Sequence, residues 1–214
     1  EKQILMKALG AKIVTTPTAA GMEGAIEEAT KLAQKTPNSY MPQQFSNPSN
    51  AKAHYATTAR EIYEELDGKI DIFVAGVGTG GTFTGVARFL KENLPDVKTM
   101  AVEPQGSILG KGKPGSHKIE GIGVDDLNTA KILDRNLIDE VITVKDEDAH
   151  STLNFLAKHE GMLVGSSSGA AAFASKIIAE RHKDNNLNIV TVFPDSSERY
   201  LSKNLYGDFN VWEK

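Results

Sequence analysis

The chain has 214 residues, of which 40% are hydrophobic and 24% charged, a composition typical of a globular protein of about one to one and a half domains. Its formal net charge is −4 with no basic run, and no apolar stretch approaches the roughly 18 residues of a membrane helix. We therefore expect neither nucleic acid nor a membrane as a partner. The absence of cysteine excludes disulfides, thiolate metal sites and a cysteine nucleophile, and it fits a reducing, cytoplasmic location.

The first 41 residues predict helices alternating with short strands. Apolar residues at helical spacing predict a helix over residues 1–9, which Gly10 is suited to end. Residues 12–16 predict a short strand, and an amphipathic helix then runs to about residue 35. Residues 40–41 predict another short strand.

A polar, irregular segment follows at residues 43–50, with the sequence QQFSNPSN. Its two glutamine amides, a hydroxyl and an aromatic ring could together hold a carboxylate or an amide. On composition alone, a solvated linker with a helix cap at Ser49 or Asn50 is the better explanation. Residues 51–66 then predict one continuous helix.

The unit around which the chain is organised spans residues 70–94. Residues 70–75 read as a buried strand, residues 76–81 contain four glycines, and residues 82–94 predict an amphipathic helix. Glycines let a ligand approach the bare main chain, and the start of a helix presents unpaired N–H groups and a positive dipole end. With hydroxyls from Thr79 and Thr82, this unit predicts a phosphate-binding turn.

Three explanations of this turn are open at this point. Gly76, Gly78 and Gly81 match the dinucleotide-binding spacing, and Glu103 stands where a ribose-binding acid is expected. A single phosphate monoester, as on pyridoxal phosphate, would fit the same turn. The glycines could also serve packing alone. A P-loop is excluded, because no Gly-Lys-Ser/Thr follows.

The next elements are a strand at residues 97–102 and a loop at residues 105–123 that contains six glycines. A loop of this length inside a domain is usually functional or disordered. Its last residues, 120–123, present backbone amides and carbonyls against which a ligand could stack. We interpret the lysines and the histidine in this loop as solvated.

The last third continues the alternation of strands and helices. Residues 140–144 predict a strand, and Asp146 is a suitable N-cap for a helix that runs to about residue 159. Residues 165–169, GSSSG, precede an alanine-rich helix that runs to about residue 181, and their serines could either cap that helix or bind a ligand. Residues 188–193 predict the last strand, which the sequence PDSSERY follows.

These elements predict an α/β fold with a mostly parallel sheet and helices on both faces. Ligands of such sheets bind beyond the carboxyl ends of the strands. The turns that follow Gly76, Glu103 and Asp195, together with the turn at Ser167, could therefore face one crevice. The five histidines are scattered without metal-ligand spacing, so we assign no metal; we expect His54, near a helix start, to be a surface residue.

Five ordered motifs together resemble the cysteine synthase family, the fold-type II pyridoxal-phosphate-dependent enzymes that include O-acetylserine sulfhydrylase and cystathionine β-synthase. The motifs are GVGTGGTFTG at 76–85, QQFSNPSN at 43–50, KPGSHKIEGIG at 113–123, VGSSSGAA at 164–171 and FPDSSERYLS at 193–202. The resemblance implies a three-layer α/β fold like that of tryptophan synthase β-subunits and makes the dinucleotide explanation much weaker.

The resemblance also implies roles for individual residues. The cofactor phosphate would be bound by Gly78, Thr79, Gly80, Gly81 and Thr82. In the family's Ile-Ser-Ser-Gly pattern, the first serine bonds to the pyridine nitrogen, and it corresponds to Ser167. Residues similar to those that border the family's substrate are Gln44, Phe45, Gly121, Ile122 and Gly123.

The chain departs from the family in lacking the lysine that carries the cofactor as a Schiff base, so it holds no catalytic residue of its own. We expect that lysine upstream of Glu1, and we interpret the chain as the C-terminal two-thirds of such an enzyme. Residues 1–46 would end the smaller, mobile domain, and residues 47–214 would form most of the larger, cofactor-binding domain.

The implied reaction joins O-acetylserine and sulfide to give cysteine and acetate, in a protein that is usually a homodimer. The GSSSG sequence keeps a cystathionine β-synthase-like condensation of serine or O-acetylserine with homocysteine as an alternative. A non-catalytic fragment that binds only phosphate or a partner protein is a third possibility.

Overall fold

The computed structural model describes residues 1–207, and the chain divides into two compact units, Glu1–Gln43 and Gln44–Lys214. The division falls three residues before the domain boundary expected after residue 46. The assignment of the two parts to a mobile and a cofactor-binding domain stays a prediction. Each unit is described by itself.

The first unit is helical. It contains α1 (Lys2–Ala8), a single 3₁₀ turn (Thr18–Ala20) and α2 (Gly21–Lys35). The strands predicted at residues 12–16 and 40–41 are wrong, since both segments are irregular in this unit. An extended segment becomes a strand only when its backbone groups pair with a neighbouring strand, and the described residues of this unit provide none.

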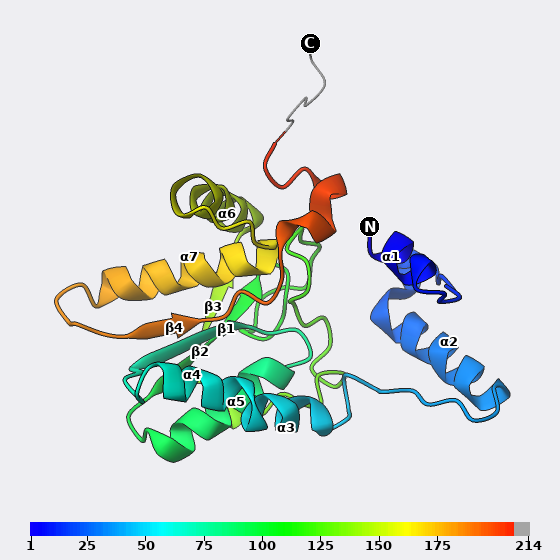
Figure 1. Ribbon diagram of the computed structural model, residues 1–214, viewed down its shortest axis with the longest axis horizontal. Coiled ribbons are helices and arrows are strands. Elements are labelled where there is room, and N and C mark those ends of the chain that lie inside the picture. The colour runs from blue at the N-terminus through cyan, green and yellow to red at the C-terminus, as the bar shows by residue number, and fades with distance from the viewer. Residues whose placement is uncertain (208–214) are drawn as a thin grey trace, which may run out of the picture. The chain divides into compact units, whose positions relative to one another are not determined.

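The second unit is built on a four-stranded parallel sheet (Figure 1). Its strands are β1 (Ile72–Gly76), β2 (Lys98–Pro104), β3 (Glu140–Val144) and β4 (Ile189–Thr191), in the spatial order β3-β2-β1-β4. Every neighbouring pair is parallel. The predicted α/β fold with a parallel sheet is therefore confirmed.

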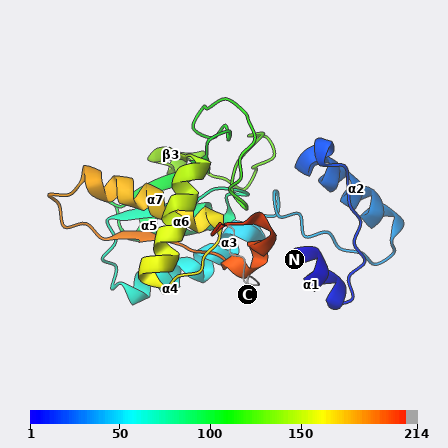
Figure 2. The ribbon, with the colours of Figure 1, turned by 90° about the horizontal axis from the view of Figure 1, so that it is seen from above.

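Helices lie on both sides of this sheet. One side carries α3 (Ser49–Ala56), α4 (Thr58–Glu65) and α5 (Gly81–Asn93), and the other carries α6 (Asp146–Glu160) and α7 (Ser166–Arg181). Figure 2 shows α6 crossing over α7. The crossing is close, because a Cβ added at Gly169 of α7 would overlap the carbonyl oxygen of Ala149 in α6. Two further 3₁₀ segments are Arg135–Leu137 and Ser197–Lys203.

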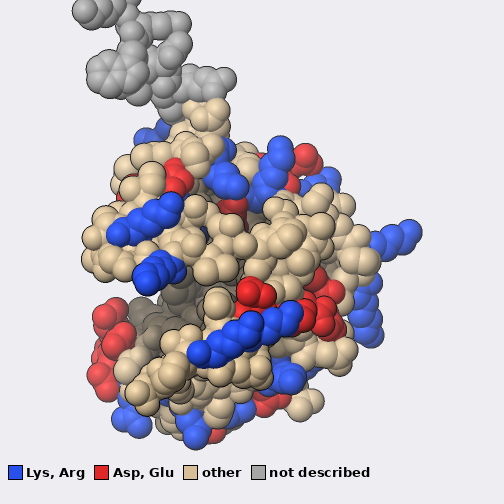
Figure 3. Space-filling model, turned by 90° about the vertical axis from the view of Figure 1, so that its right-hand side faces the viewer, with Lys and Arg blue, Asp and Glu red and all other residues tan. Residues whose placement is uncertain are grey.

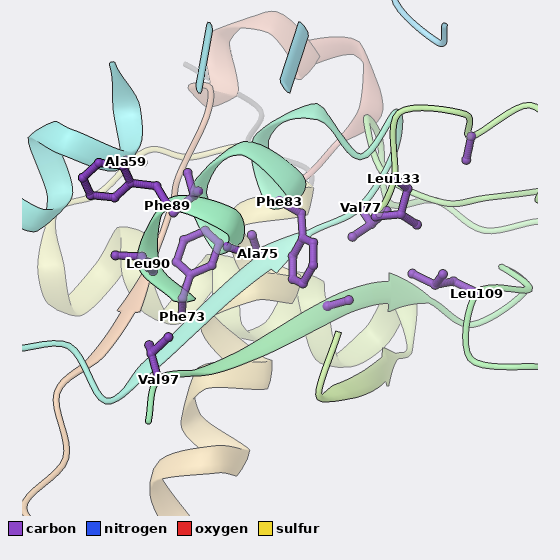
Figure 4. Close-up of a cluster of buried hydrophobic side chains, with 14 of the residues drawn as sticks. Ala59, Phe73, Ala75, Val77, Phe83, Phe89, Leu90, Val97, Leu109 and Leu133 are labelled. Carbon is purple, nitrogen blue, oxygen red and sulfur yellow. The ribbon is translucent and has the colours of Figure 1, made fainter. Parts of the chain in front are cut away.

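The buried strand β1 supplies both cores, because successive side chains of a strand point to opposite faces. Phe73 and Ala75 face α5, where they pack with Phe83 and Leu90 (Figure 4). Ile72 and Val74 face α6 and α7 in the second cluster. The continuous apolar character of this strand, noted in the sequence, follows from burial on both faces.

Two predicted helix boundaries are wrong. The helix expected over residues 51–66 is two helices, which separate at Thr57, where φ is −121° and ψ is −82°. Asp146 is not the N-cap of α6, since Lys145 holds that position. The carboxylate of Asp146 instead accepts a hydrogen bond from the backbone N–H of Lys118 at 2.9 Å and thereby holds the long loop.

That loop is ordered although it contains almost no regular structure. Leu109 and Ile119 are buried in the two clusters. The carboxylate of Glu103 accepts hydrogen bonds from the N–H groups of Leu109 and Gly110, at 2.9 and 3.0 Å. Of the two alternatives for the loop, disorder is therefore excluded.

Basic and acidic side chains are interspersed on the face that Figure 3 shows, without an extended surface of one sign. This pattern agrees with the small net charge of −4. Among the described residues, none of the helices has the length and apolar character needed to cross a bilayer.

Candidate cofactor and substrate site

The turn between β1 and α5 has the backbone of an anion-binding site. Gly80, which has no side chain with which to cap the helix, is the N-cap of α5, with a left-handed φ of 85°. A Cβ at Gly80 would lie 2.8 Å from the Cα of Leu133, so only glycine fits there. The first N–H groups and the positive dipole end of α5 are thus turned toward the carboxyl edge of the sheet.

Both threonines of this turn are held by side chains from α3. The Thr79 hydroxyl lies 3.1 Å from Nδ2 of Asn50 and 3.3 Å from the N–H of Gly81. The Thr82 hydroxyl lies 3.1 Å from Nε2 of His54, whose Nδ1 lies 3.0 Å from the hydroxyl of Thr58.

His54 is therefore not the surface residue that the sequence predicted. Burial lowers the pKa of its imidazole, which favours the neutral ring beside Thr82. Asn50 and His54 are four residues apart on one helix, the spacing that places two side chains on the same face. That spacing is the one signal in the sequence that could have linked them.

The end of the glycine-rich loop lies against the same turn. A Cβ at Gly78 would approach the carbonyl oxygen of Gly121 to 2.7 Å, and one at Gly76 would approach Ile122 to the same distance. The N–H of Gly123 donates to the carbonyl of Val77 at 2.8 Å. Residues 121–123, predicted from sequence to border a ligand, are thus brought directly to the phosphate-binding turn.

The three consecutive serines have three different environments. Ser166 accepts a hydrogen bond from the N–H of Glu120 at 2.9 Å and so ties the loop to the start of α7. Ser168 is fully buried, and its hydroxyl has no hydrogen-bond partner. Ser167 lines a cavity, and its role toward the cofactor stays a prediction.

This cavity joins the motifs that the sequence singled out. Its lining residues are Ala75, Gly76, Thr82, Ile122, Ser167, Val192 and Pro194. Its volume is about 50 Å³, below the roughly 300–1,000 Å³ of pockets that enclose a whole small molecule, and it is open to solvent. Thr82, Ile122 and Ser167 come from three distant segments and meet here.

The turn at Asp195 directly follows Pro194, which lines the cavity. The carbonyl of Asp195 accepts from the N–H of Gly165 at 3.1 Å, and its carboxylate accepts from the hydroxyl of Tyr200. Burial and this hydrogen bond raise the pKa of Tyr200, so the phenol stays protonated. The other carboxylate oxygen of Asp195 is buried without a partner.

Glu103 does not take part in the site. Its side chain is 0% exposed, and its oxygens accept from two backbone N–H groups and from the hydroxyl of Thr143 at 2.9 Å. A carboxylate engaged in this way cannot bind a ribose, so the dinucleotide explanation is wrong. The acid at the end of β2 serves to hold the loop.

The predicted substrate residues Gln44 and Phe45 lie in the turn before α3. The carbonyl of Gln44 accepts from Nδ2 of Asn50 at 2.8 Å, and the side chain of Phe45 is half-buried. The segment is thus attached to the phosphate-binding turn through Asn50. The substrate roles of Gln44, Phe45, Gly121, Ile122 and Gly123 stay predictions.

The cavity wall thus holds Thr82, from the first turn of α5, and Ser167, from the first turn of α7. The donor groups present fit pyridoxal phosphate, because backbone N–H groups at the start of α5 and the hydroxyl of Thr82 could bind a phosphate and the hydroxyl of Ser167 could meet a ring nitrogen. Residues 1–195 match the family model described as pyridoxal-phosphate dependent enzyme. The chain belongs to this family.

Relatives of known name have high sequence identity. The chain is 48% identical to a cysteine synthase of Helicobacter pylori strain J99, over 97% of this chain and 67% of that protein. It is 50% identical to the O-acetylserine dependent cystathionine beta-synthase of Bacillus subtilis, over 96% of this chain and 66% of that protein. The chain thus spans about two thirds of the length of these relatives.

Solved structures show the same fold. The O-acetylserine dependent cystathionine beta-synthase of Helicobacter pylori superimposes with a TM-score of 0.89 at 48% identity, over 96% of this chain and 66% of that one. A cysteine synthase of Entamoeba histolytica gives a TM-score of 0.88 at 41% identity, over 96% and 60%. The predicted fold type, that of pyridoxal-phosphate enzymes of the cysteine synthase group, is confirmed.

Proposed function

We propose that the protein is a pyridoxal-phosphate-dependent β-replacement enzyme that converts O-acetylserine and sulfide to cysteine and acetate. The observation that carries this proposal is the cavity in which Thr82, Ile122 and Ser167 meet. It combines the phosphate-binding turn, the glycine-rich loop and the serine turn, and the relatives named cysteine synthase support the reaction.

The residues of the site would divide the work as follows. The N–H groups at the start of α5, with the hydroxyls of Thr79 and Thr82, would bind the phosphate. When bound, pyridoxal phosphate supplies an electron sink for the charge left by a proton that leaves the α-carbon of an amino acid. Ser167 would orient the ring with a neutral hydroxyl, which does not hold the ring nitrogen protonated. The weaker sink favours loss of a β-substituent over transamination.

A cystathionine-forming reaction with homocysteine is the second candidate. It is favoured by the 50% identity to the Bacillus subtilis enzyme named for that activity with O-acetylserine. Both candidates share the first half of the reaction and differ in the thiol that adds. Measuring cysteine and cystathionine formed from O-acetylserine with sulfide or with homocysteine decides between them.

The test of the common proposal uses Ser167→Ala and, as a matched control, Ser175→Ala. Ser175 lies on the same helix and donates to the carbonyl of Ala171 at 2.8 Å. In the full-length protein, where we expect the Schiff-base lysine upstream of Glu1, the wild type and Ser175→Ala should show a visible cofactor band that shifts on adding O-acetylserine, and Ser167→Ala should bind the cofactor more weakly. If the wild type shows no such band, the protein is better explained as one that binds a ligand without catalysing a reaction. Unchanged spectra in Ser167→Ala would refute the role of Ser167.

The homodimer is part of the same proposal. Light scattering of the purified protein should give twice the mass of one subunit. A monomer that turns over O-acetylserine at full rate would show that the dimer is not needed.

A further inference from the structure

Asn50 connects two motifs that the proposed function treats separately. Its Nδ2 lies 2.8 Å from the carbonyl oxygen of Gln44 and 3.1 Å from the hydroxyl of Thr79. The first contact belongs to the QQF segment and the second to the phosphate-binding turn. Asn50 itself is the second residue of α3.

The direction of each hydrogen bond follows from chemistry. A backbone carbonyl only accepts, so the Asn50 atom next to Gln44 is the amide nitrogen, and that nitrogen only donates. The Thr79 hydroxyl therefore accepts from Asn50. It also accepts from the N–H of Gly81 at 3.3 Å, since a backbone N–H only donates.

A threonine hydroxyl has one proton and two lone pairs. With both lone pairs of Thr79 engaged by N–H donors, its remaining interaction is to donate its proton. A hydroxyl restricted in this way is suited to an acceptor without protons, such as a phosphate oxygen, and unsuited to a neutral donor.

The position of the amide is fixed by its surroundings. A Cβ added at Gly81 would overlap Oδ1 of Asn50, so the carboxamide fills the space above this glycine. Gly81 is thus required by Asn50, and any side chain at position 81 would displace the amide from Thr79.

We propose that Asn50 is a positioning residue that makes Thr79 a hydrogen-bond donor to the bound phosphate and couples phosphate binding to the order of the Gln44 segment. This inference rests on the proposed function, because the phosphate is that of the cofactor. Coupling is reciprocal: a phosphate that engages Thr79 stabilises the Asn50–Gln44 contact, and the segment so held favours phosphate binding.

The test compares Asn50→Leu with Asn93→Leu. Asn93 is at the far end of α5, where its Nδ2 donates to the carbonyl of Phe89 at 2.8 Å, so the control loses one similar hydrogen bond away from the site. We expect Asn50→Leu to bind pyridoxal phosphate about tenfold more weakly, as for one hydrogen bond to a charged group. Its affinity for pyridoxal, which lacks the phosphate, should stay that of the wild type.

Two further measurements separate positioning from general damage. Amide hydrogen exchange of residues 44–49 should become faster in Asn50→Leu than in Asn93→Leu, and pyridoxal phosphate should slow it in the wild type and in Asn93→Leu but not in Asn50→Leu. Thr79→Val should weaken phosphate-dependent binding by a similar factor. The double variant of Asn50 and Thr79 should lose little more than either single variant, because both act through one hydroxyl.

The outcomes distinguish the inference from the proposed function. A wild type that binds pyridoxal phosphate no better than pyridoxal would refute the phosphate site itself. A wild type that prefers pyridoxal phosphate, with the same preference in Asn50→Leu or with additive losses in the double variant, would overturn the role of Asn50 alone.

Discussion

Gly80 has a left-handed backbone conformation and lies in close contact with Leu133. Its replacement by alanine therefore tests the geometry of the phosphate-binding turn. Its φ is 85°, and an added Cβ would lie 2.6 Å from the Cβ of Leu133 and 2.8 Å from its Cα. The left-handed conformation costs an alanine about 1–2 kcal/mol. Forcing a methyl group against a buried backbone adds about 1–3 kcal/mol. Gly80→Ala should thus lower the free energy of unfolding by about 2–5 kcal/mol.

The matched control is Gly161→Ala. Gly161 ends α6 with a φ of 69°, but an added Cβ would meet nothing within 4 Å. Only the conformational cost of about 1–2 kcal/mol applies there. Urea unfolding followed by circular dichroism gives both free energies, provided that the slopes stay equal. If Gly80→Ala loses no more stability than Gly161→Ala, the crowding at Leu133 does not exist.

Gly80→Ala also has a functional readout. Because Gly80 is the N-cap of α5, a shift of the turn moves the N–H groups that the proposal assigns to the phosphate. We expect Gly80→Ala to retain less cofactor after dialysis, while Gly161→Ala retains as much as the wild type. Equal retention in both variants would refute the phosphate-binding role of this turn.

Three further predictions use the same unfolding assay. Burial lowers the pKa of His54 below its usual value of about 6.5, so the unfolded chain binds more protons and the free energy of unfolding falls as the pH drops. Between about pH 7.5 and about pH 5.5 this fall should be smaller in His54→Gln than in the wild type. An identical fall in both would contradict the lowered pKa of His54. Glu103→Gln places an amide N–H against backbone N–H donors and should lower the free energy of unfolding by about 1–3 kcal/mol. The exposed control Glu147→Gln should lower it by less than about 1 kcal/mol. Equal losses in the two variants would contradict the structural role of Glu103. Gly169→Ala should cost about 1–3 kcal/mol where α6 crosses α7, and no loss would mean that the helices separate freely.

The sequence predicted well those elements whose signal is local. The apolar run of β1 and the strand Glu140–Val144 lie where composition and periodicity place them, and the alanine-rich helix ends at Arg181 as expected, although it begins at Ser166, inside the GSSSG segment. Buried parallel strands and glycine turns impose their residue types at short range. The strands predicted at residues 12–16 and 40–41 are absent because a strand also needs a neighbouring strand to pair with. A local sequence pattern does not show whether such a partner exists.

In the candidate site, too, local features could be predicted from the sequence and contacts between distant residues could not. The phosphate-binding turn and the serine turn could be recognised from the sequence, since glycines and hydroxyls stand together in each. The links that complete the site could not: Asn50 and Thr79 are 29 residues apart, and His54 and Thr82 are 28 apart. Their contacts depend on how α3 packs against α5.

By itself the sequence determined the parallel α/β fold and the family, and it singled out the turns that we assign to a phosphate-bearing cofactor, because these depend on residue types in short segments. Only the tertiary structure decided that Glu103 holds a loop instead of a ribose and that Ser167 alone of three serines lines the cavity. Only the packing of distant segments also showed that Asn50 and His54 face the turn. A side chain's function depends on the donors and acceptors that packing brings to it, and those come from parts of the chain that its own neighbours do not specify.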